Sequence, residues 1–417
     1  MSSTLVGLWF LAAEHLRLGS WDLLKGYTGG GDGGIDPRIA MQMVNEAALC
    51  KNRIRKKNYI THQGFELMGG LSFLASDEQV HSLLNSHTVN QAQSLQESLA
   101  IIRHNNDHYK GDVFAIDPHR IISATKRVMP KRKKQPSEPS KKMLQTFFCL
   151  DTETGQPIGC GIGTPGVNTT KATIDLLEMT SKITNNNAII LADKEHFTQK
   201  LISEVKGSEQ VEFLVPAPST GRIKKIERSL RYTSQWAGYS IAETTFNFRG
   251  AKDQYRLIIQ REGERDGQYK YRPFLSVSEK PAVTLLTEMY AKRWSIEEFF
   301  NFDGPMGFDR ASTFNLNVRY GKMSLALMAQ AATYGLRQKL PTPYNAWNAV
   351  HLSDAIFNKI DGDLRVQNDT IIVTCYNMPK QLKLEEHYQN LPQKLLAEGI
   401  DPKVPWLYNY KLDFRFK

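Results

Sequence analysis

Cysteine is scarce in this chain of 417 residues. Its four cysteines include no CxxC pair and no Cys/His zinc spacing, which argues against structural zinc and favours a reducing compartment. A membrane span is missing too. The apolar stretch Leu5–Ala13 is too short to cross a bilayer and has no basic flank or cleavage site before it. We therefore expect a cytoplasmic protein.

Acidic residues are outnumbered. The sequence has 53 Lys and Arg against 43 Asp and Glu, a net charge of +10 and a pI near 9.2. Such an excess favours a polyanionic partner over a small acidic substrate, although a merely basic enzyme would have the same composition. The length suggests two or three domains, and the composition is that of a soluble globular protein.

Residues 1–105 are predicted to form a helical N-terminal DNA-binding domain. Apolar residues recur at helical spacing in Leu5–Leu24 and Asp36–Lys51. Ser76 is a plausible N-cap for a short helix, and a polar turn separates that helix from a longer one over Thr88–Arg103. Short helix, turn and longer helix are the outline of a helix-turn-helix, but generic helical pairs look the same.

Residues 106–205 have the alternating pattern of an α/β fold. The expected elements are strands at Val113–Ile116, Met143–Leu150 and Pro157–Ile162, a helix over Thr169–Ile183, a buried strand at Ala188–Ala192 and a helix through Val205. Three antiparallel strands, a crossover helix and a parallel strand are the opening of an RNase H-like fold.

Short alternating segments separated by Gly, Pro and charged turns fill residues 206–280, which we interpret as a β-rich insertion. Residues 281–340 then contain a long helix from Pro281 to about Phe302 and an apolar helix over Tyr320–Leu340. The predicted fold class is α/β, an RNase H-like core interrupted by a β-rich insertion, with a helical N-terminal domain. Residues 341–417 have no readable role.

Two aspartates follow predicted neighbouring strands, Asp117 after the first and Asp193 after the buried fourth. Acidic residues from different elements can converge on two divalent metals that promote in-line displacement at a phosphodiester. Hard oxygen ligands suit Mg²⁺ or Mn²⁺. Carboxylates at strand ends are also common turn residues, so neither aspartate alone identifies a site. Asp151 also ends a strand and competes with Asp117, but choosing it would leave the meander one strand short.

The helix from Pro281 carries further candidates. At about 100° per residue, Tyr290, Arg293 and Glu297 lie within about 60° of each other, beside an apolar stripe, whereas Glu298 points away. The geometry thus favours Glu297 as a third carboxylate. An Arg–Glu pair on a solvated face is the alternative.

The string Tyr290-Ala-Lys-Arg293-Trp294-Ser-Ile296-Glu297-Glu298-Phe299 resembles the Tyr-x2-Arg-x3-Glu signature helix of bacterial insertion-sequence DDE transposases. The branch it resembles has an RNase H-like core with a β-rich insertion before the final glutamate. Phe114-Ala-Ile-Asp117 and Ile189-Ile-Leu-Ala-Asp193 are similar to the strands that carry that family's two aspartates. The resemblance spans roughly residues 105–340.

The resemblance implies cut-and-paste transposition, in which Asp117, Asp193 and Glu297 bind two Mg²⁺ or Mn²⁺ ions for cleavage and strand transfer. It assigns Tyr290 and Arg293 to DNA near the cleaved phosphate. The implied partners are double-stranded DNA, as terminal inverted repeats and as target, and a second copy of the chain in a homodimeric DNA complex. The implied location is the bacterial cytoplasm, at the nucleoid.

One position departs from the family pattern. The signature usually continues to a lysine seven residues after the glutamate, and here that position is Gly304. Arg310, Arg319 and Lys322 are the next basic residues and could substitute. The chain could instead be an inactive, transposase-derived DNA-binding protein. A third possibility is an RNase H-like nuclease that hydrolyses DNA without strand transfer.

Further DNA contacts are expected from a basic run between the first two core strands, which includes Lys131, Arg132, Lys133 and Lys134. Charge runs are often solvated linkers, but this one follows closely on Asp117 and could grip the DNA backbone. Trp236, in the insertion, could stack on an unpaired or flipped base, with core packing as the alternative.

Overall fold

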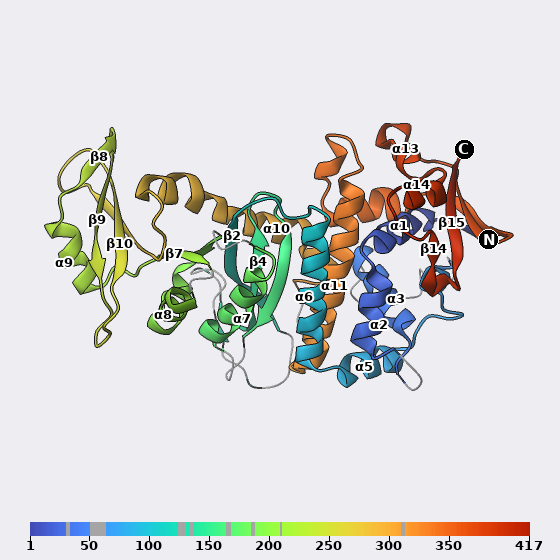
Figure 1. Cartoon of the computed structure of the whole chain (residues 1–417), viewed down its shortest axis with the longest axis horizontal. Coiled ribbons are helices and arrows are strands. Elements are labelled where there is room, and N and C mark those ends of the chain that lie inside the picture. The colour runs from blue at the N-terminus through green and yellow to red at the C-terminus, as the bar shows by residue number, and fades with distance from the viewer. Residues whose placement is uncertain are drawn as a thin grey trace. The chain divides into compact units, whose positions relative to one another are not determined.

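The computed structural model describes the chain except residues 31–33, 51–63, 124–127, 129–130, 133–136, 138, 164–167, 185–187, 209–210 and 310–312. The chain divides into two compact units. Unit 1 comprises residues 1–103, 123–126 and 300–417, and unit 2 comprises residues 104–122 and 127–299 (Figure 1).

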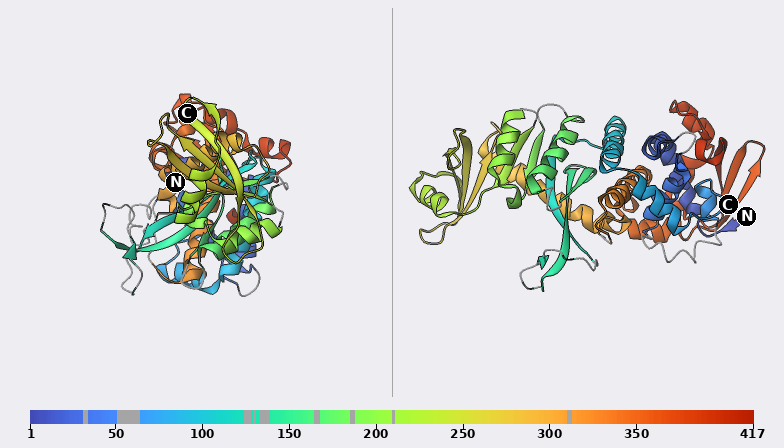
Figure 2. Two further views of the ribbon diagram at one scale, coloured as in Figure 1. Left: turned by 90° about the vertical axis from the view of Figure 1, so that its left-hand side faces the viewer. Right: turned by 90° about the horizontal axis from the view of Figure 1, so that it is seen from below.

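Unit 2 is built on one mixed sheet, whose described part has ten strands. They are β2 (Val113–Ile122), β3 (Lys131–Arg132), β4 (Lys141–Asp151), β5 (Pro157–Ile162), β6 (Ile189–Ala192), β7 (Glu212–Pro216), β8 (Thr233–Trp236), β9 (Tyr239–Phe246), β10 (Tyr255–Glu262) and β11 (Lys270–Ser276). Their order is β3-β4-β2-β6-β7-β11-β10-β9-β8, with β5 also paired to β4. Figure 2 shows β2 and β4 extending beyond the shorter strands beside them.

The predicted meander is present: β2 pairs antiparallel with β4, β4 antiparallel with β5, and β6 lies parallel to β2. The strand β7 differs from expectation. The sequence pattern placed it in the insertion, but it pairs parallel with β6 and is the fifth strand of the core sheet. A short strand buried on both faces has no alternation that would distinguish it from the strands that follow it.

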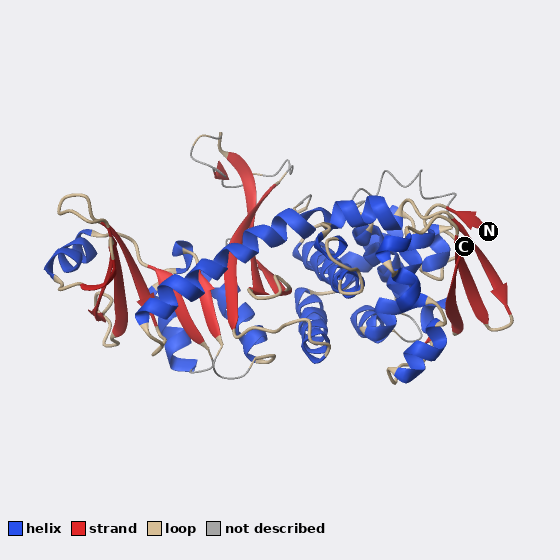
Figure 3. Ribbon diagram, turned by 90° about the horizontal axis from the view of Figure 1, so that it is seen from above, coloured by secondary structure: helices blue, strands red, loops and turns tan. Residues whose placement is uncertain are grey.

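The two faces of this sheet are covered by different helices. On the face we call face A, Val113, Leu191, Leu214 and Phe274 pack in one core with the helical segment that begins at Ala282. Figure 3 shows this segment running across the strands. On the opposite face, face B, the helices α7 (Thr169–Ser181) and α8 (Gln199–Ser208) contact the strands β4, β5 and β7.

The helical segment on face A changes its winding twice. It is a π-helix over Thr284–Met289, a 3₁₀ helix over Tyr290–Trp294 and the α-helix α10 over Ser295–Asp303. The sequence predicted one regular helix. Its apolar stripe is nevertheless buried where the pattern required, for example at Leu285 and Ile296. π and 3₁₀ turns inside a helix commonly mark functional positions, and the turn here carries the signature tyrosine and arginine.

The insertion extends the core sheet, because β11 pairs antiparallel with β7. It also contains a helix that the sequence analysis did not predict, α9 (Gly221–Ser229). Thr220 caps this helix by accepting a hydrogen bond at Oγ1 from the backbone N–H of Ile223, at 3.3 Å.

Unit 1 combines the N-terminal helices with the C-terminal region. Its helices include α1 (Phe10–Arg17), α2 (Ser20–Thr28), α3 (Pro37–Ala48), α5 (Asp77–Ser86), α6 (Val89–Asn105) and α11 (Leu316–Arg337). Its sheet has the order β1-β12-β13-β15-β14, with β1 (Ser2–Ser3), β12 (Gly362–Gln367), β13 (Thr370–Cys375), β14 (Lys403–Val404) and β15 (Tyr410–Phe416).

The first residues therefore do not form a compact unit of their own, which differs from the predicted boundary at residue 105. The strand β1 pairs with β12, and α1 and α3 pack against α11. The predicted helix over Leu5–Leu24 is also interrupted, because Gly19 adopts a φ of 57° between α1 and α2. These contacts join segments that are far apart in the sequence, so no local pattern could show them.

The predicted helix-turn-helix outline corresponds to α5 and α6. Ser76 caps α5 in a capping box with Gln79, as its sequence predicted. The helix α6, however, packs on α11: Gln96 donates to Ser324 at 3.0 Å, and Arg103 donates to Gln330 at 2.9 Å. Arg103 is its only Lys or Arg and is buried, so α6 presents no cation of this kind to a DNA groove.

The four cysteines, all among the described residues, form no disulfide; three are buried and Cys50 is half-buried. Within the described part of the chain, no helix is both long enough and apolar enough to span a bilayer.

Candidate active site

Strand register brings the two predicted aspartates together. In the parallel pair formed by β2 and β6, Ile116 lies opposite Ala192. The next position in this register places Asp117 beside Asp193. Because side chains alternate along a strand, both carboxylates lie on the face of Val113 and Leu191, which is face A. The helical segment that carries the third candidate covers that same face.

The 3₁₀ turn Tyr290–Trp294 packs against both β2 and β6. From this turn, Nη1 of Arg293 donates a hydrogen bond to Oδ1 of Asp117 at 2.9 Å, and both side chains are largely shielded from solvent. The Tyr290 ring packs edge-on against Phe274, with 4.8 Å between ring centroids. Tyr290 and Arg293 thus belong to a turn that lies against β2 and β6, with Arg293 bonded to Asp117.

The site is electrostatically coupled. Burial and the negative charges of Asp193 and Glu297 raise the pKa of Asp117 to about 7, against the lowering by Arg293 and Arg120. The other two predicted carboxylates therefore both act on Asp117 in this structure. Burial also raises the pKa of Tyr290, and Arg293 opposes that rise.

Residues that the sequence analysis missed hold the turn after β6. Glu195 forms an ion pair with Arg120 of β2 and accepts a hydrogen bond from Gln145 of β4 at 2.7 Å. His196 is buried, with Nδ1 3.3 Å from the carbonyl oxygen of Asp193, and burial lowers its pKa to about 4. The only local signal was that both follow Asp193 immediately, which does not reveal partners on distant strands.

The donor chemistry of the site fits a hard divalent cation. Carboxylate oxygens are the ligands that Mg²⁺ and Mn²⁺ prefer, and a cation would relieve the mutual repulsion that contributes to the raised pKa of Asp117. In this arrangement one oxygen of Asp117 is engaged by Arg293. Among the described residues, no three His, Cys, Asp or Glu side chains are close enough together to form a metal site. The three carboxylates are suitable ligands in chemistry and charge, but in this arrangement they are too far apart to coordinate one ion together.

The rival aspartate Asp151 belongs to a turn. It lies opposite Phe114, three residues further along β4 than Phe148, the partner of Asp117, and the alternation puts it on face B. Its carboxylate accepts hydrogen bonds from the backbone N–H groups of Lys110 and Glu153, at 2.9 and 3.0 Å, and from the Thr154 hydroxyl at 2.8 Å. It is fully buried and engaged.

The predicted DNA-contacting residues are unevenly placed. Lys131 is exposed on β3, whereas the Arg132 side chain, Lys133, Lys134 and Arg310 lie outside the described residues. Trp236 is 50% exposed and stacks on Tyr239, with centroids 4.2 Å apart, so it is neither a core residue nor a free one.

The candidate substitutes for the missing lysine are enclosed in unit 1. Arg319 on α11 is buried. Lys322, on the same helix, is half-buried; burial lowers its pKa, and the nearby Glu46 opposes that shift. Gly304 itself begins a short 3₁₀ turn after α10 and is buried.

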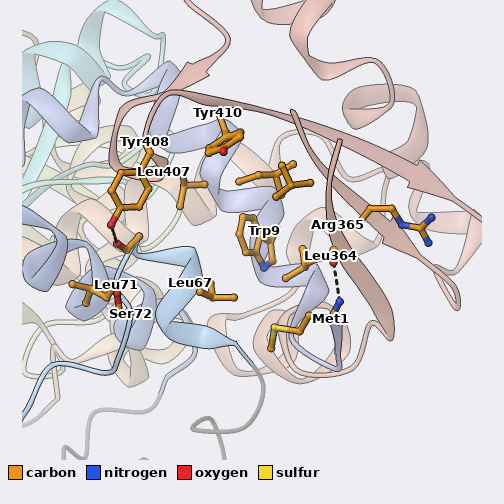
Figure 4. A pocket seen from close by; sticks show the side chains of 13 residues that line it. Met1, Trp9, Leu67, Leu71, Ser72, Leu364, Arg365, Leu407, Tyr408 and Tyr410 are labelled. Carbon is orange, nitrogen blue, oxygen red and sulfur yellow. Dashed lines mark hydrogen bonds between the residues drawn. The ribbon is translucent and has the colours of Figure 1, made fainter. Parts of the chain in front are cut away.

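A cavity of about 320 Å³ in unit 1 offers different chemistry. Its lining is mostly apolar and includes Trp9, Leu67 and Leu407, with Tyr408 at its edge (Figure 4). The charged side chain that lines it, Arg365, is paired with Asp363 at 3.0 Å. The described residues of its lining include no carboxylate, histidine or cysteine.

Comparison with known proteins gives a family for this chain and, among solved structures, a distant likeness. The sequence profile of a family described as "Transposase DDE domain" matches residues 108–331. No curated protein matches the chain. A solved structure of the piggyBac transposase in a synaptic complex with hairpin DNA is 12% identical, over 84% of this chain and 80% of that chain, with a TM-score of 0.46. A likeness of that degree decides nothing about this chain.

Proposed function

The chain belongs to the transposase DDE domain family, and from this membership we propose that it is an active DNA transposase that cuts transposon ends and joins them to target DNA. Its catalytic unit would be an RNase H-like core with a β-rich insertion, of the insertion-sequence type with a Tyr/Arg/Glu signature helix. Members of this family typically catalyse metal-dependent reactions on DNA.

One observation carries the proposal. Asp193 follows the end of β6 and Asp117 lies within the adjacent parallel strand β2, both on face A, and the turn with Tyr290 and Arg293 packs against these two strands. The ion pair between Arg293 and Asp117 joins the helix to the strand. Glu297 lies near enough to raise the pKa of Asp117. Carboxylates supplied by three separate elements are what a two-metal phosphodiester-transfer site requires.

The roles of the chain's own residues follow from their chemistry. Asp117, Asp193 and Glu297 would hold two Mg²⁺ or Mn²⁺ ions, which supply activation of the attacking oxygen and charge stabilisation of the leaving oxygen when bound. Arg293 orients Asp117 and offers further N–H donors to a phosphate. The ring of Tyr290 packs against Phe274, and its hydroxyl lies near Asp117 and Asp193.

The partner would be double-stranded DNA, as terminal repeats and as target, held by a homodimer. Supporting this, the exposed Lys131 lies on β3, which pairs with the part of β4 that carries the exposed Lys141. Exposed cations of this kind can contact a phosphate backbone. The exposed ring of Trp236 offers a surface for base stacking.

A cleavage assay on duplexes from the DNA that flanks the coding region tests this function. With Mg²⁺ or Mn²⁺, the wild type should nick the duplex and join it to a plasmid. Asp117→Asn, Asp193→Asn and Glu297→Gln should each lower the rate on the order of a hundredfold or more. Glu298→Gln, which changes the neighbouring exposed carboxylate of the same helix, is the matched control and should retain activity.

Other outcomes identify the alternatives. Binding without cleavage in either metal would mean an inactive DNA-binding protein. Cleavage without joining would mean a nuclease. Equal losses for the Glu297 and Glu298 variants would refute the assignment of the third carboxylate.

A further inference from the structure

The helix α9 of the insertion, together with the turn after it, concentrates exposed positive charge (Figure 1). Its exposed cations are Arg222, Lys224, Lys225, Arg228 and Arg231. The single acidic residue of the helix, Glu227, is buried. The charged side chains on the solvent-facing side of α9 are therefore all cations, and no part of the active site described above uses them.

The cations occupy one side of the helix. At about 100° per residue, Lys224, Lys225 and Arg228 span an arc of about 100°, and the buried Ile223 and Glu227 lie on the other side. Lys224 and Arg228 are also four residues apart, a spacing at which like charges destabilise a helix by a few tenths of a kcal/mol.

One acidic residue, Glu227, lies near these charges and acts on Lys224 and Arg228. Within the described chain, Lys224, Lys225, Arg228 and Arg231 nevertheless form no ion pair. Other cations of the insertion do, with Arg256 2.7 Å from Glu243 and Arg272 3.6 Å from Glu262. An excess of like charges of this kind is complementary to a polyanion.

The helix is also held firmly, unlike a solvated linker. Arg222 donates to the carbonyl oxygen and Oδ1 of Asn247, at 2.8 and 2.7 Å, and lies over the Phe246 ring. The Tyr232 hydroxyl donates to the carbonyl oxygen of Glu227 at 2.8 Å. The four free cations are thus displayed on a fixed support, which lowers the entropic cost of binding.

The cationic side of α9 lies across the sheet from the carboxylates. Tyr232 packs on Arg261 and Tyr271, which face each other across β10 and β11. Arg261 is three residues from Ile258, and alternation therefore puts it on face B, whereas Ile258 belongs to the face A core beneath Leu285. Duplex DNA is stiff over tens of base pairs, so a straight duplex at Asp117 would not also lie along α9.

We propose that α9 binds the sugar–phosphate backbone of a second duplex, the target DNA, through Lys224, Lys225, Arg228 and Arg231. The inference rests on the proposed transposase function but concerns a different surface from the cleavage site. The contact is to phosphates, so it carries no base specificity.

The test compares the wild type with a variant in which Lys224, Lys225, Arg228 and Arg231 are all changed to Gln, a residue of similar helix propensity. The matched control removes four exposed cations of unit 1: Lys359, Lys380, Lys403 and Arg415. Two reactions are measured for each protein: cleavage of a short flanking-DNA duplex, and joining of pre-cut ends to limiting plasmid. Binding to a plasmid without end sequences is measured separately in EDTA over a range of salt.

The α9 variant should cleave the short duplex within about twofold of the wild type, join it to plasmid on the order of tenfold more slowly, and lose roughly 0.9 of salt slope per lost phosphate contact. The control should change little. Unchanged joining and plasmid binding would overturn the proposal, as would an equal loss in short-duplex cleavage, since α9 would then hold the end DNA. If the wild type cleaves nothing, the proposed function fails, and the plasmid-binding measurement still decides whether α9 contacts DNA.

Discussion

Asp117 differs from an ordinary surface carboxylate in three ways: it is shielded, it is paired with Arg293, and it lies within the field of two other carboxylates. Burial and the two like charges prevail over the arginine, so its pKa is about 7 rather than the ordinary 3.8. The residue is thus poorly stabilised as an anion until a cation other than Arg293 is present.

This shift predicts a pH effect on stability without divalent metal. Because the folded-state pKa of Asp117 exceeds its unfolded value, the folded state binds more protons between these two pH values, and stability decreases as the pH rises from about 4 to about 7. Asp117→Asn removes this contribution. In EDTA, the melting temperature of the variant minus that of the wild type should therefore increase across that range. A difference that stays constant with pH would contradict the pKa shift.

Gly304 allows the missing lysine to be tested directly. The nearest described atom to a Cβ built at this position is the Cβ of Asp309, at 3.9 Å, and the backbone is not in the left-handed region. Gly304→Lys should therefore fold and, by adding a cation, bind flanking DNA a few-fold more tightly. Gly304→Ala supplies the side-chain effect without the charge. If the two variants bind and cleave alike, a cation at this position is irrelevant.

At the scale of elements, the sequence was informative where the signal is local. The end of the buried strand before Asp193 and the buried stripe beside Glu297 follow from apolar periodicity, and the structure has them. The predicted strand end at Asp117 was wrong, because β2 continues through Asp117 to Ile122. The assignment of β7 was wrong because a short buried strand does not indicate its partner. The helix α9 was missed because its basic composition resembles a solvated loop, although Thr220 offered a capping signal.

Pairings between distant segments had no sequence signal at all. The ion pair of Glu195 with Arg120 and the position of Arg293 against Asp117 depend on the tertiary fold. So does the anchor at the end of α10, where the carboxylate of Asp303 accepts hydrogen bonds from Arg337, at 2.6 and 3.0 Å, and from Gln330 at 2.8 Å.

That anchor predicts a large stability effect. Asp303 and Arg337 are both buried, and Arg103 joins the same network through Gln330. Asp303→Asn leaves the buried guanidinium group of Arg337 without its carboxylate and should destabilise the protein by about 3–5 kcal/mol in urea unfolding. Asp22→Asn breaks an exposed pair with Lys25 and should cost about 0.5 kcal/mol or less. Similar losses for both variants would mean that the buried network contributes little.

At the scale of the whole molecule, the proposed catalytic carboxylates and the α9 cations all belong to unit 2. Unit 1 contributes the buried network at Asp303 and, in Lys322 and Arg319, cations that are largely enclosed. One boundary between the units falls inside α10 (Ser295–Asp303): the helix belongs to unit 2 up to Phe299 and to unit 1 from Phe300. One helix therefore carries a proposed metal ligand in one unit and an anchor in the other.

This division predicts which segments bound metal protects from amide hydrogen exchange. A ligand stabilises the segments whose unfolding releases it, by about 2.7 kcal/mol at a hundredfold excess over its dissociation constant. Amide hydrogen exchange with Mg²⁺ or Mn²⁺ should therefore slow in β2 and β6, which lead to Asp117 and Asp193, and little in β12, β13 and β15 of unit 1. The Asp193→Asn variant should lose this protection while its exchange without metal stays near that of the wild type. Protection spread evenly over both units, or kept by the variant, would mean that the metal does not bind at the proposed carboxylates.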